Sequence, residues 1–174
     1  MKTPHLIIAA SGALLLTACQ SNPPLETVDY VDLERFMGDW YVIANMPTFI
    51  ERDAHNAVES YHLDEDGSIA TTFTFRDGSF DGKLKTYRPR GFVVDTESNA
   101  VWGMQFVWPF KGDYRVIYLD SEYNTTVIGR NKLDYVWLMS RQPDLSREDY
   151  DRAVAAISSA GYDISQLQRV PQRW

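Results

Sequence analysis

The sequence predicts an all-β domain of eight strands followed by one α-helix. From Trp40 to Ser140, β-rich stretches alternate with short segments of aspartate, asparagine and glycine, the residues that tight turns require. Eight short strands at regular spacing are typical of a β-sandwich or an up-and-down barrel, and the spacing alone leaves both open. The predicted strands are Trp40–Asn45, Ala57–Leu63, Ile69–Phe75, Leu84–Val94, Ala100–Trp108, Tyr114–Leu119, Thr125–Gly129 and Tyr135–Ser140, with one of the turns at Lys111-Gly112-Asp113.

One amphipathic helix is predicted after the last strand. Ser146 can cap its first turn together with Asp149, and Gly161 stands where a left-handed C-terminal cap is expected. An apolar stripe that includes Ala153 and Ile157 faces one side of this helix. A single amphipathic helix after eight strands must lie against the outside of the sheet. A shorter helical turn is expected before the first strand, at residues 32–37.

Length and charge restrict the class of protein. The 174 residues suffice for one domain with a sizeable core. The formal net charge of -7 argues against a nucleic-acid partner and against electrostatic attachment to anionic lipids. The single cysteine excludes an intramolecular disulfide.

The first eighteen residues have the pattern of a lipoprotein signal peptide. The apolar run from Leu6 to Leu16 is too short to be a permanent membrane span. It ends in Leu16-Thr17-Ala18-Cys19, which resembles the lipobox cleaved by lipoprotein signal peptidase. This resemblance implies cleavage before Cys19, with diacylglycerol on its thiol and an acyl chain on its new amino group. Two or more acyl chains anchor a protein stably in a membrane. An ordinary secretory peptide with an incidental cysteine is the alternative.

These features divide the chain into three segments. We expect a signal peptide over residues 1–18, a lipidated tether over residues 19–28, and one domain over residues 29–174. Pro23-Pro24 favour an extended tether. Gln20, directly after the cysteine, implies sorting to the outer membrane by the same resemblance.

Three short motifs resemble those of the lipocalin family in order and spacing. They are Gly38-Asp39-Trp40-Tyr41, Asp120-Ser121-Glu122-Tyr123 and Trp137-Leu138-Met139-Ser140-Arg141. Around them, Phe106–Tyr114 and Asp134–Pro143 resemble the bacterial lipoprotein branch related to apolipoprotein D. The resemblance runs from about residue 29 to the end and implies an eight-stranded antiparallel up-and-down barrel with the C-terminal α-helix packed outside.

The resemblance gives the motif residues a structural role. The indole of Trp40 is expected to plug the closed end of the barrel, and the guanidinium of Arg141 to pack across it in a cation–π contact. Gly38, Asp120 and Tyr123 belong to the same set of fold residues. We expect these five to identify the fold and to take no part in binding.

The barrel interior is the candidate binding site, because eight strands enclose room for one small ligand. Alternate side chains of a strand point inward, so Trp40 predicts Val42, Ala44 and Met46 inside on the first strand. An aromatic, methionine-containing wall suits acyl chains and other apolar molecules, and a collapsed, self-filled core is the alternative. Alternation and alignment to the family predict a lining of Tyr61, Phe73, Phe75, Val93, Trp102, Met104, Phe106, Trp108, Tyr114, Val116, Tyr118 and Trp137.

Charged residues near this interior leave two questions open. Glu59 is predicted to point inward, where a buried carboxylate would disfavour an anionic head group, unless it sits at the wet mouth. Lys83, Lys85, Arg88 and Arg90 could meet a phosphate or carboxylate at the mouth. They could equally form a solvated basic face.

The sequence shows no constellation for catalysis or metal binding. Its three histidines, His5, His55 and His62, lack partners at zinc-like spacing, and no nucleophile elbow or phosphate loop is present. We therefore predict a binding protein without enzymatic activity, metal or cofactor.

The functional hypothesis is a lipocalin anchored at the bacterial outer membrane, with its barrel on the periplasmic side. It would bind and store or transport fatty acids or lysophospholipids in envelope maintenance or stress. The alternative is a structural or stress-related envelope lipoprotein with a self-filled barrel and no dedicated ligand. A homodimer across the open end is a further hypothesis, suggested by the many aromatic residues.

Overall fold

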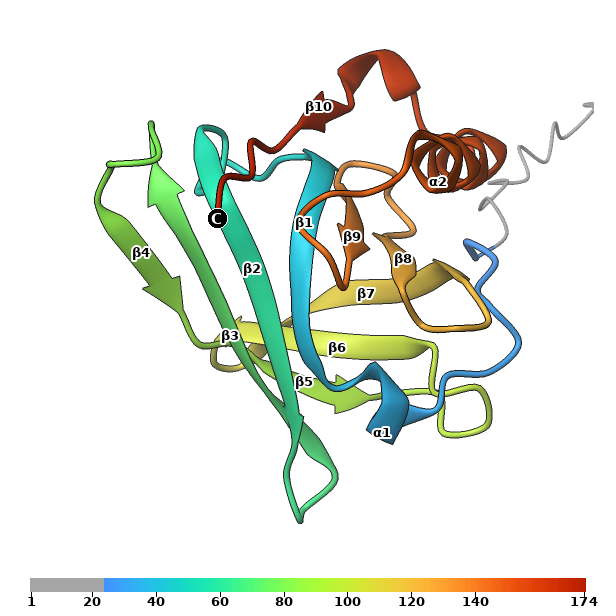
Figure 1. Cartoon of the computed structure of the whole chain (residues 1–174). Helices are drawn as coiled ribbons and strands as arrows, with labels where there is room; N and C mark the ends of the chain where they lie inside the picture. The colour runs from blue at the N-terminus through green and yellow to red at the C-terminus, as the bar shows by residue number, and fades with distance from the viewer. Residues whose placement is uncertain (1–23) are drawn as a thin grey trace, which may run out of the picture.

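The computed structural model describes residues 24–174, so the predicted signal peptide and Cys19 lie outside the described residues. One antiparallel sheet runs in the order β1-β2-β3-β5-β6-β7-β8-β9, and β9 pairs back with β1 to close a barrel (Figure 1). This closure confirms the predicted barrel and decides against a sandwich. The strands are β1 (Gly38–Met46), β2 (Ala54–Leu63), β3 (Ser68–Asp77), β4 (Leu84–Tyr87), β5 (Arg90–Val93), β6 (Val101–Val107), β7 (Phe110–Leu119), β8 (Thr125–Gly129) and β9 (Val136–Ser140).

Helical segments lie at both ends of this sheet. The short α1 (Leu33–Phe36) precedes β1, and α2 (Arg147–Ser159) packs outside the barrel (Figure 1). A 3₁₀ turn, η1 (Ile164–Gln166), leads into the short β10 (Gln168–Arg169), which pairs with β1. None of the helices within residues 24–174 is long and apolar enough to cross a bilayer.

The predicted C-terminal helix is confirmed, including its caps. The Ser146 hydroxyl accepts a hydrogen bond from the Asp149 N–H at 3.1 Å, as an N-cap should. Gly161 has a φ of 96° directly after the helix, a conformation that a side chain would strain. Local capping residues in the sequence therefore mark both ends of this helix.

The predicted strand Leu84–Val94 is broken into β4 and β5 at Arg88-Pro89. Proline has no N–H to donate to a ladder, so the pairing with β3 is interrupted there. The Thr71 N–H still donates to the Pro89 carbonyl at 3.1 Å. Both pieces pair with β3, so together they occupy one of the eight positions around the barrel.

The hairpin between β6 and β7 turns at Trp108-Pro109, and the predicted turn at Lys111–Asp113 is wrong. Val107 pairs with Phe110, and Gly112 lies within β7 opposite Met104. Pro109 has no N–H to donate to the ladder, so the pairing between β6 and β7 cannot continue through it.

Two hydrophobic clusters hold the domain together. The inner cluster lies inside the barrel and includes Phe36, Trp40 and Trp102 near the closed end. The outer cluster lies between the outer face of the sheet and α2. It consists of Ile43, Ala44, Met46, Val127, Val136, Leu138, Ala153, Ile157 and Tyr162.

Two β-bulges change which side chains point into the barrel. In β1 the register against β9 shifts between Val42 and Ala44, so Val42 stays in the inner cluster whereas Ala44 and Met46 join the outer one. In β7 the register against β8 shifts between Val116 and Tyr118, and Tyr118 packs on the outer cluster. The predicted inward orientation of Ala44, Met46 and Tyr118 is wrong because an extra residue reverses the alternation.

Trp40 and Arg141 close one end of the barrel. The Trp40 side chain is fully buried, and its Nε1–H donates to the Phe36 carbonyl at 2.9 Å. The Arg141 guanidinium lies 3.8 Å from the centre of the Trp40 ring and donates to the carbonyls of Arg35, Phe36, Met37 and Asp39. The packing implied by the family resemblance is therefore present.

The second motif ties the neighbouring turn to this closed end. The Asp120 carboxylate accepts hydrogen bonds from the backbone N–H groups of Glu122, Asn124 and Thr125. The Tyr123 hydroxyl accepts from the Asp32 N–H at 2.9 Å, at the start of α1. Gly38 enters β1 with a φ of 94°, which suits glycine.

The last residues of the predicted tether lie on the barrel. The Leu25 N–H donates to Oδ1 of Asn131 at 2.7 Å, in the loop between β8 and β9. The Val28 N–H donates to the Val116 carbonyl on β7 at 3.0 Å. The chain is thus held against the domain from Leu25 onward.

Candidate functional site

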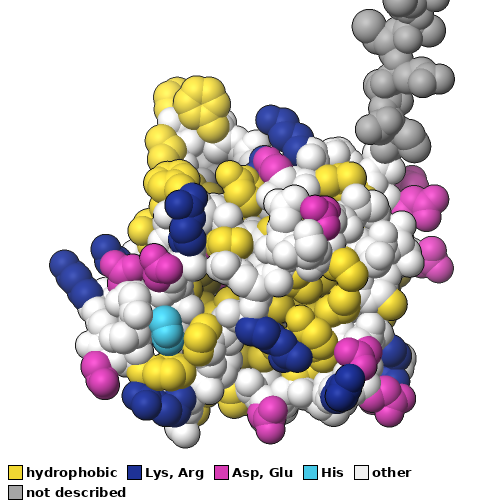
Figure 2. All heavy atoms as spheres, turned by 90° about the horizontal axis from the view of Figure 1, so that it is seen from above, with side chains coloured by type: hydrophobic (Ala, Val, Ile, Leu, Met, Phe, Trp, Pro, Cys, Tyr) yellow, Lys and Arg dark blue, Asp and Glu magenta, His cyan; other side chains and the backbone are white. Residues whose placement is uncertain are grey.

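An apolar cavity opens at the end of the barrel opposite Trp40. It has a volume of about 500 Å³. Seen from above, the molecule shows hydrophobic side chains gathered in and around a hollow on this face (Figure 2). Its aliphatic and aromatic lining consists of Phe49, Ile50, Phe73, Tyr87, Pro89, Met104, Phe106, Val107, Phe110, Tyr114 and Trp137.

The predicted lining divides into three groups. Lining the cavity are Phe73, Met104, Phe106, Tyr114 and Trp137. A second group packs in or against the inner cluster, namely Tyr61, Phe75, Val93, Trp102 and Val116. The remaining two lie elsewhere, because Trp108 is 81% exposed at the hairpin tip and Tyr118 faces the outer cluster.

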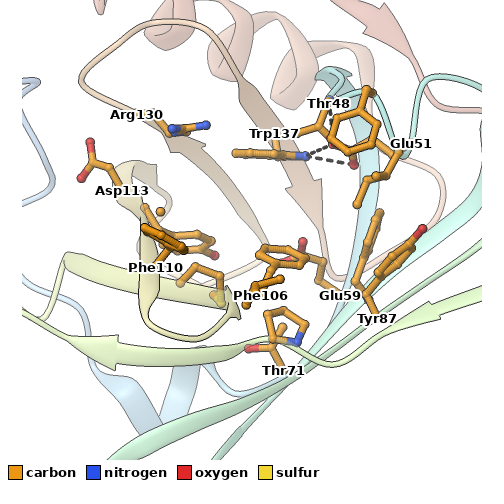
Figure 3. A pocket seen from close by; sticks show the side chains of 18 residues that line it. Thr48, Glu51, Glu59, Thr71, Tyr87, Phe106, Phe110, Asp113, Arg130 and Trp137 are labelled. Carbon is orange, nitrogen blue, oxygen red and sulfur yellow. Dashed lines mark hydrogen bonds between the residues drawn. The ribbon is translucent and has the colours of Figure 1, made fainter.

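Sequence reasoning missed the β1–β2 loop, which forms one wall. Thr48, Phe49, Ile50 and Glu51 all line the cavity (Figure 3). Consecutive apolar residues in a predicted loop are a signal that could have found them, since loops seldom expose such pairs without a use. Tyr87 and Phe110 were missed because Tyr87 stands next to a strand break that was not predicted and Phe110 stands next to the misplaced turn.

Glu59 and two tyrosines form a hydrogen-bonded chain deep in the barrel. The Tyr61 hydroxyl donates to the Glu59 carboxylate, and the hydroxyls of Tyr61 and Tyr114 lie 2.7 Å apart. Burial raises the pKa of Glu59 to about 7, the Tyr61 hydrogen bond opposes this, and the charge of Glu51 adds to it. Glu59 lines the cavity, so the predicted inward orientation holds and the group sits well inside the mouth.

Glu51 is a second buried acid in the wall. Its two carboxylate oxygens accept hydrogen bonds from Nε1 of Trp137 at 3.1 and 3.2 Å, and one accepts from the Thr48 N–H at 3.0 Å (Figure 3). Burial raises the pKa of Glu51, opposed by these hydrogen bonds. The pair fixes the Trp137 indole and the β1–β2 loop against each other. Phe106 and Phe110 lie on the opposite side of the cavity (Figure 3).

Arg130 is the cation that lines the cavity, at the end of β8. Its Nε lies 3.5 Å from an oxygen of Asp134, yet within residues 24–174 this buried nitrogen has no hydrogen-bond partner. Asp113, also in the lining, is engaged by Arg115 at 3.0 Å and by the Asn131 N–H at 2.8 Å. Arg130 therefore places a cation at this edge of the cavity, paired with Asp134.

The basic residues near β4 do not reach the cavity. Arg90 donates to Asp64 at 2.8 Å, at the hairpin between β2 and β3, and Lys85 pairs with Asp77 at 3.4 Å. None of the four basic residues lines the cavity, neither Lys83 and Lys85 nor Arg88 and Arg90. Their arrangement corresponds to the solvated basic face.

Comparison with known proteins agrees with this barrel and its motifs. Residues 31–172 match the Lipocalin-like domain family. The chain belongs to the lipocalin family. This lipocalin is 31% identical to the outer membrane lipoprotein Blc of Citrobacter freundii and 29% identical to that of Escherichia coli K12, and each alignment covers 99% of this chain and 98% of the relative.

A solved structure supports the same fold. Insecticyanin from the tobacco hornworm Manduca sexta superimposes with a TM-score of 0.68 at 15% identity, covering 85% of this lipocalin and 84% of that chain. The predicted family is confirmed. A lipocalin barrel with an open apolar cavity has the architecture of a protein that binds a small hydrophobic ligand.

Proposed function

We propose that this lipocalin holds one single-chain amphiphile, a fatty acid or a lysophospholipid, and is anchored to the bacterial outer membrane by lipid on Cys19. The cavity of about 500 Å³ carries the proposal, because it is open and almost wholly apolar. The lipobox-like sequence and relatives named outer membrane lipoprotein support the anchor. With its barrel in the periplasm, the protein would store or transport such ligands in envelope maintenance or stress.

The charges around the cavity favour a ligand that enters tail first. An anionic head group deep in the barrel would face Glu59 and Glu51, and a buried anion without a cation or donors is costly. At the edge it would meet the guanidinium of Arg130, whose charge and N–H groups suit a carboxylate or phosphate oxygen. The tail would then lie among Phe73, Met104 and the other apolar lining.

The alternative is a barrel that holds no ligand and serves a structural role. The open volume speaks against it, since unfilled apolar space forfeits packing contacts. Under this alternative, fatty acids and lysophospholipids would leave the melting temperature and the tryptophan fluorescence of the protein unchanged. The predicted lack of enzymatic activity stays a prediction.

Gly112→Leu tests the cavity directly. Gly112 shares the inward face of β7 with Tyr114, and an added Cβ would meet only the Met104 carbonyl oxygen at 3.6 Å. The leucine is expected to occupy the cavity and abolish binding of oleate and lysophosphatidylethanolamine, measured by tryptophan fluorescence and native mass spectrometry. Thr86→Leu, on the exposed face of β4, is the matched control and should bind normally. Unchanged binding in a folded Gly112→Leu protein would contradict the proposal.

Arg130→Gln tests the orientation of the ligand in the same assays. Oleate binding should weaken by roughly ten-fold, because a charge-assisted hydrogen bond is lost, while binding of oleyl alcohol stays the same. Arg147→Gln, an exposed cation on α2, is the control. Equal losses for the acid and the alcohol would argue against a head group at Arg130.

A further inference from the structure

The mouth of the cavity is ringed by exposed apolar side chains. Phe49 is 83% exposed, Trp108 81% and Phe110 76%, and Phe106 and Val107 also expose more than half of their surface. We call these five residues the rim. Apolar groups gathered in this way mark a surface that meets another apolar partner.

The rim is continuous with the cavity. Phe49 comes from the β1–β2 loop and the other four from the β6–β7 hairpin, and all except Trp108 also line the cavity. Whatever covers the rim therefore also faces the opening through which a ligand must pass. The rim and the entrance form one surface.

The N-terminal end of the described chain lies beside this entrance. The Leu25 N–H donates a hydrogen bond to the side chain of Asn131. The N–H of Asn131 in turn donates to the cavity-lining Asp113 at 2.8 Å. Six peptide units separate Cys19 from Leu25, and a fully extended chain of that length spans about 20 Å. Lipid on Cys19 would thus be held within about 20 Å of Leu25.

Two surfaces of the domain could face the bilayer that holds the anchor, and only one suits it. Leu25 packs on the outer cluster beneath α2, whose exposed face carries Arg147, Glu148, Asp151 and Arg152. The other surface is the apolar rim. With a net charge of -7, the protein would gain membrane affinity by immersing apolar side chains rather than by charge.

We propose that the rim docks on the same bilayer that holds the Cys19 anchor, with its aromatic side chains in the boundary between head groups and acyl chains. This rests on the anchor of the proposed function. Trp and Phe are suited to that boundary, because a ring buries apolar surface close to polar head groups. In this position an amphiphile passes between bilayer and cavity without crossing water.

Quenching by brominated lipids tests the docking. Lipidated protein from the full chain is reconstituted in phosphatidylethanolamine–phosphatidylglycerol vesicles with or without bromine on the acyl chains. Trp108 should be quenched, so Trp108→Phe should remove most of the quenching. Trp174→Phe is the control, because this exposed indole packs edge-on against Tyr41 outside the barrel. Quenching that Trp108→Phe leaves unchanged would overturn the proposal.

Three further arms separate docking at the rim from lipid inside the cavity, from a missing anchor and from a dimer. All variants are repeated in a Gly112→Leu background, where Trp137 cannot be quenched by lipid inside the cavity, and the Trp108 signal should persist.

A chain recovered without lipid on Cys19 would overturn the anchor and this proposal with it, whereas lipidated protein without quenching at Trp108 would overturn the docking alone. A dimer that shields Trp108 from lipid would also overturn it and assign the rim to a second copy.

The rate of ligand uptake gives an independent readout. Trp108→Asp should slow transfer of lysophospholipid from vesicle to protein by roughly ten-fold, with unchanged affinity for ligand supplied from solution. Val94→Asp, at the exposed loop beside the closed end, should leave the transfer rate unchanged. Equal rates for Trp108→Asp and the original protein would overturn docking through the rim.

Discussion

Replacing Glu59 by glutamine should remove a pH-dependent cost from the folded barrel. Burial raises the pKa of Glu59 from 4.5 to about 7. A difference of this size corresponds to about 3 kcal/mol in the free energy of unfolding. Glutamine has nearly the same shape, can still accept the hydrogen bond from Tyr61, and never ionises.

The direction of the effect follows from which state binds the proton. Below about pH 4.5 Glu59 is protonated in both the folded and the unfolded chain, and it costs nothing. Between about pH 4.5 and 7 the folded chain keeps the proton that the unfolded chain has lost, so the stability contributed by Glu59 falls as pH rises. Above about pH 7 the loss is complete, and Glu59→Gln should be more stable by about 3 kcal/mol.

Urea unfolding followed by tryptophan fluorescence at several pH values between about 4.5 and 8 measures this difference. The gap between Glu59→Gln and the original protein should open as pH rises through that window. Glu65→Gln, at the exposed tip of the β2–β3 hairpin, is the control and should show no such gap. A gap that is constant with pH, or a variant that is less stable at pH 8, would refute the inference that burial of Glu59 penalises its charge.

Two stability predictions follow from the closed end and the helix cap. Arg141→Ala should lower the free energy of unfolding by about 2–4 kcal/mol, because five carbonyls lose a donor and Trp40 loses the cation above its ring. Arg147→Ala, on the exposed face of α2, should change it by less than about 0.5 kcal/mol. Similar urea midpoints for the two would contradict this. Ser146→Ala should cost about 1 kcal/mol through the lost N-cap, and Ser158→Ala, exposed later in α2, should cost much less. If Ser158→Ala lowers the free energy of unfolding as much as Ser146→Ala does, the loss of the N-cap does not explain the effect of Ser146→Ala.

Features set by neighbouring residues were predictable. Apart from the turn predicted at Lys111–Asp113 and the break at Arg88-Pro89, the predicted turns separate strands that lie within a few residues of their predicted bounds. Ser146 and Gly161 mark the ends of α2. The motifs around Trp40 and Arg141 predicted the contact at the closed end, because the family resemblance supplied a pairing between distant residues.

Features that depend on pairing between distant strands could not be predicted from the inward and outward alternation of side chains along one strand. Alternation assumes an unbroken ladder, and the bulges before Ala44 and Tyr118 reverse it where β1 meets β9 and β7 meets β8. The alternation of side chains along a strand predicts which face of the sheet a side chain lies on, but not how deep in the barrel it lies. Trp102 and Phe73 were both predicted to line the cavity, but only Phe73 does so.

The amino-acid sequence by itself determined the class of fold, the helix and its ends, the family, and the expectation of an apolar interior. Those properties arise from local turn chemistry, capping and hydrophobic composition. Only the tertiary structure decided that the interior holds an open cavity, that Glu59, Tyr61 and Tyr114 meet inside the barrel, and that the rim lies at the mouth of the cavity. The physical reason is that depth and proximity in a closed barrel depend on the register between strands far apart in the chain.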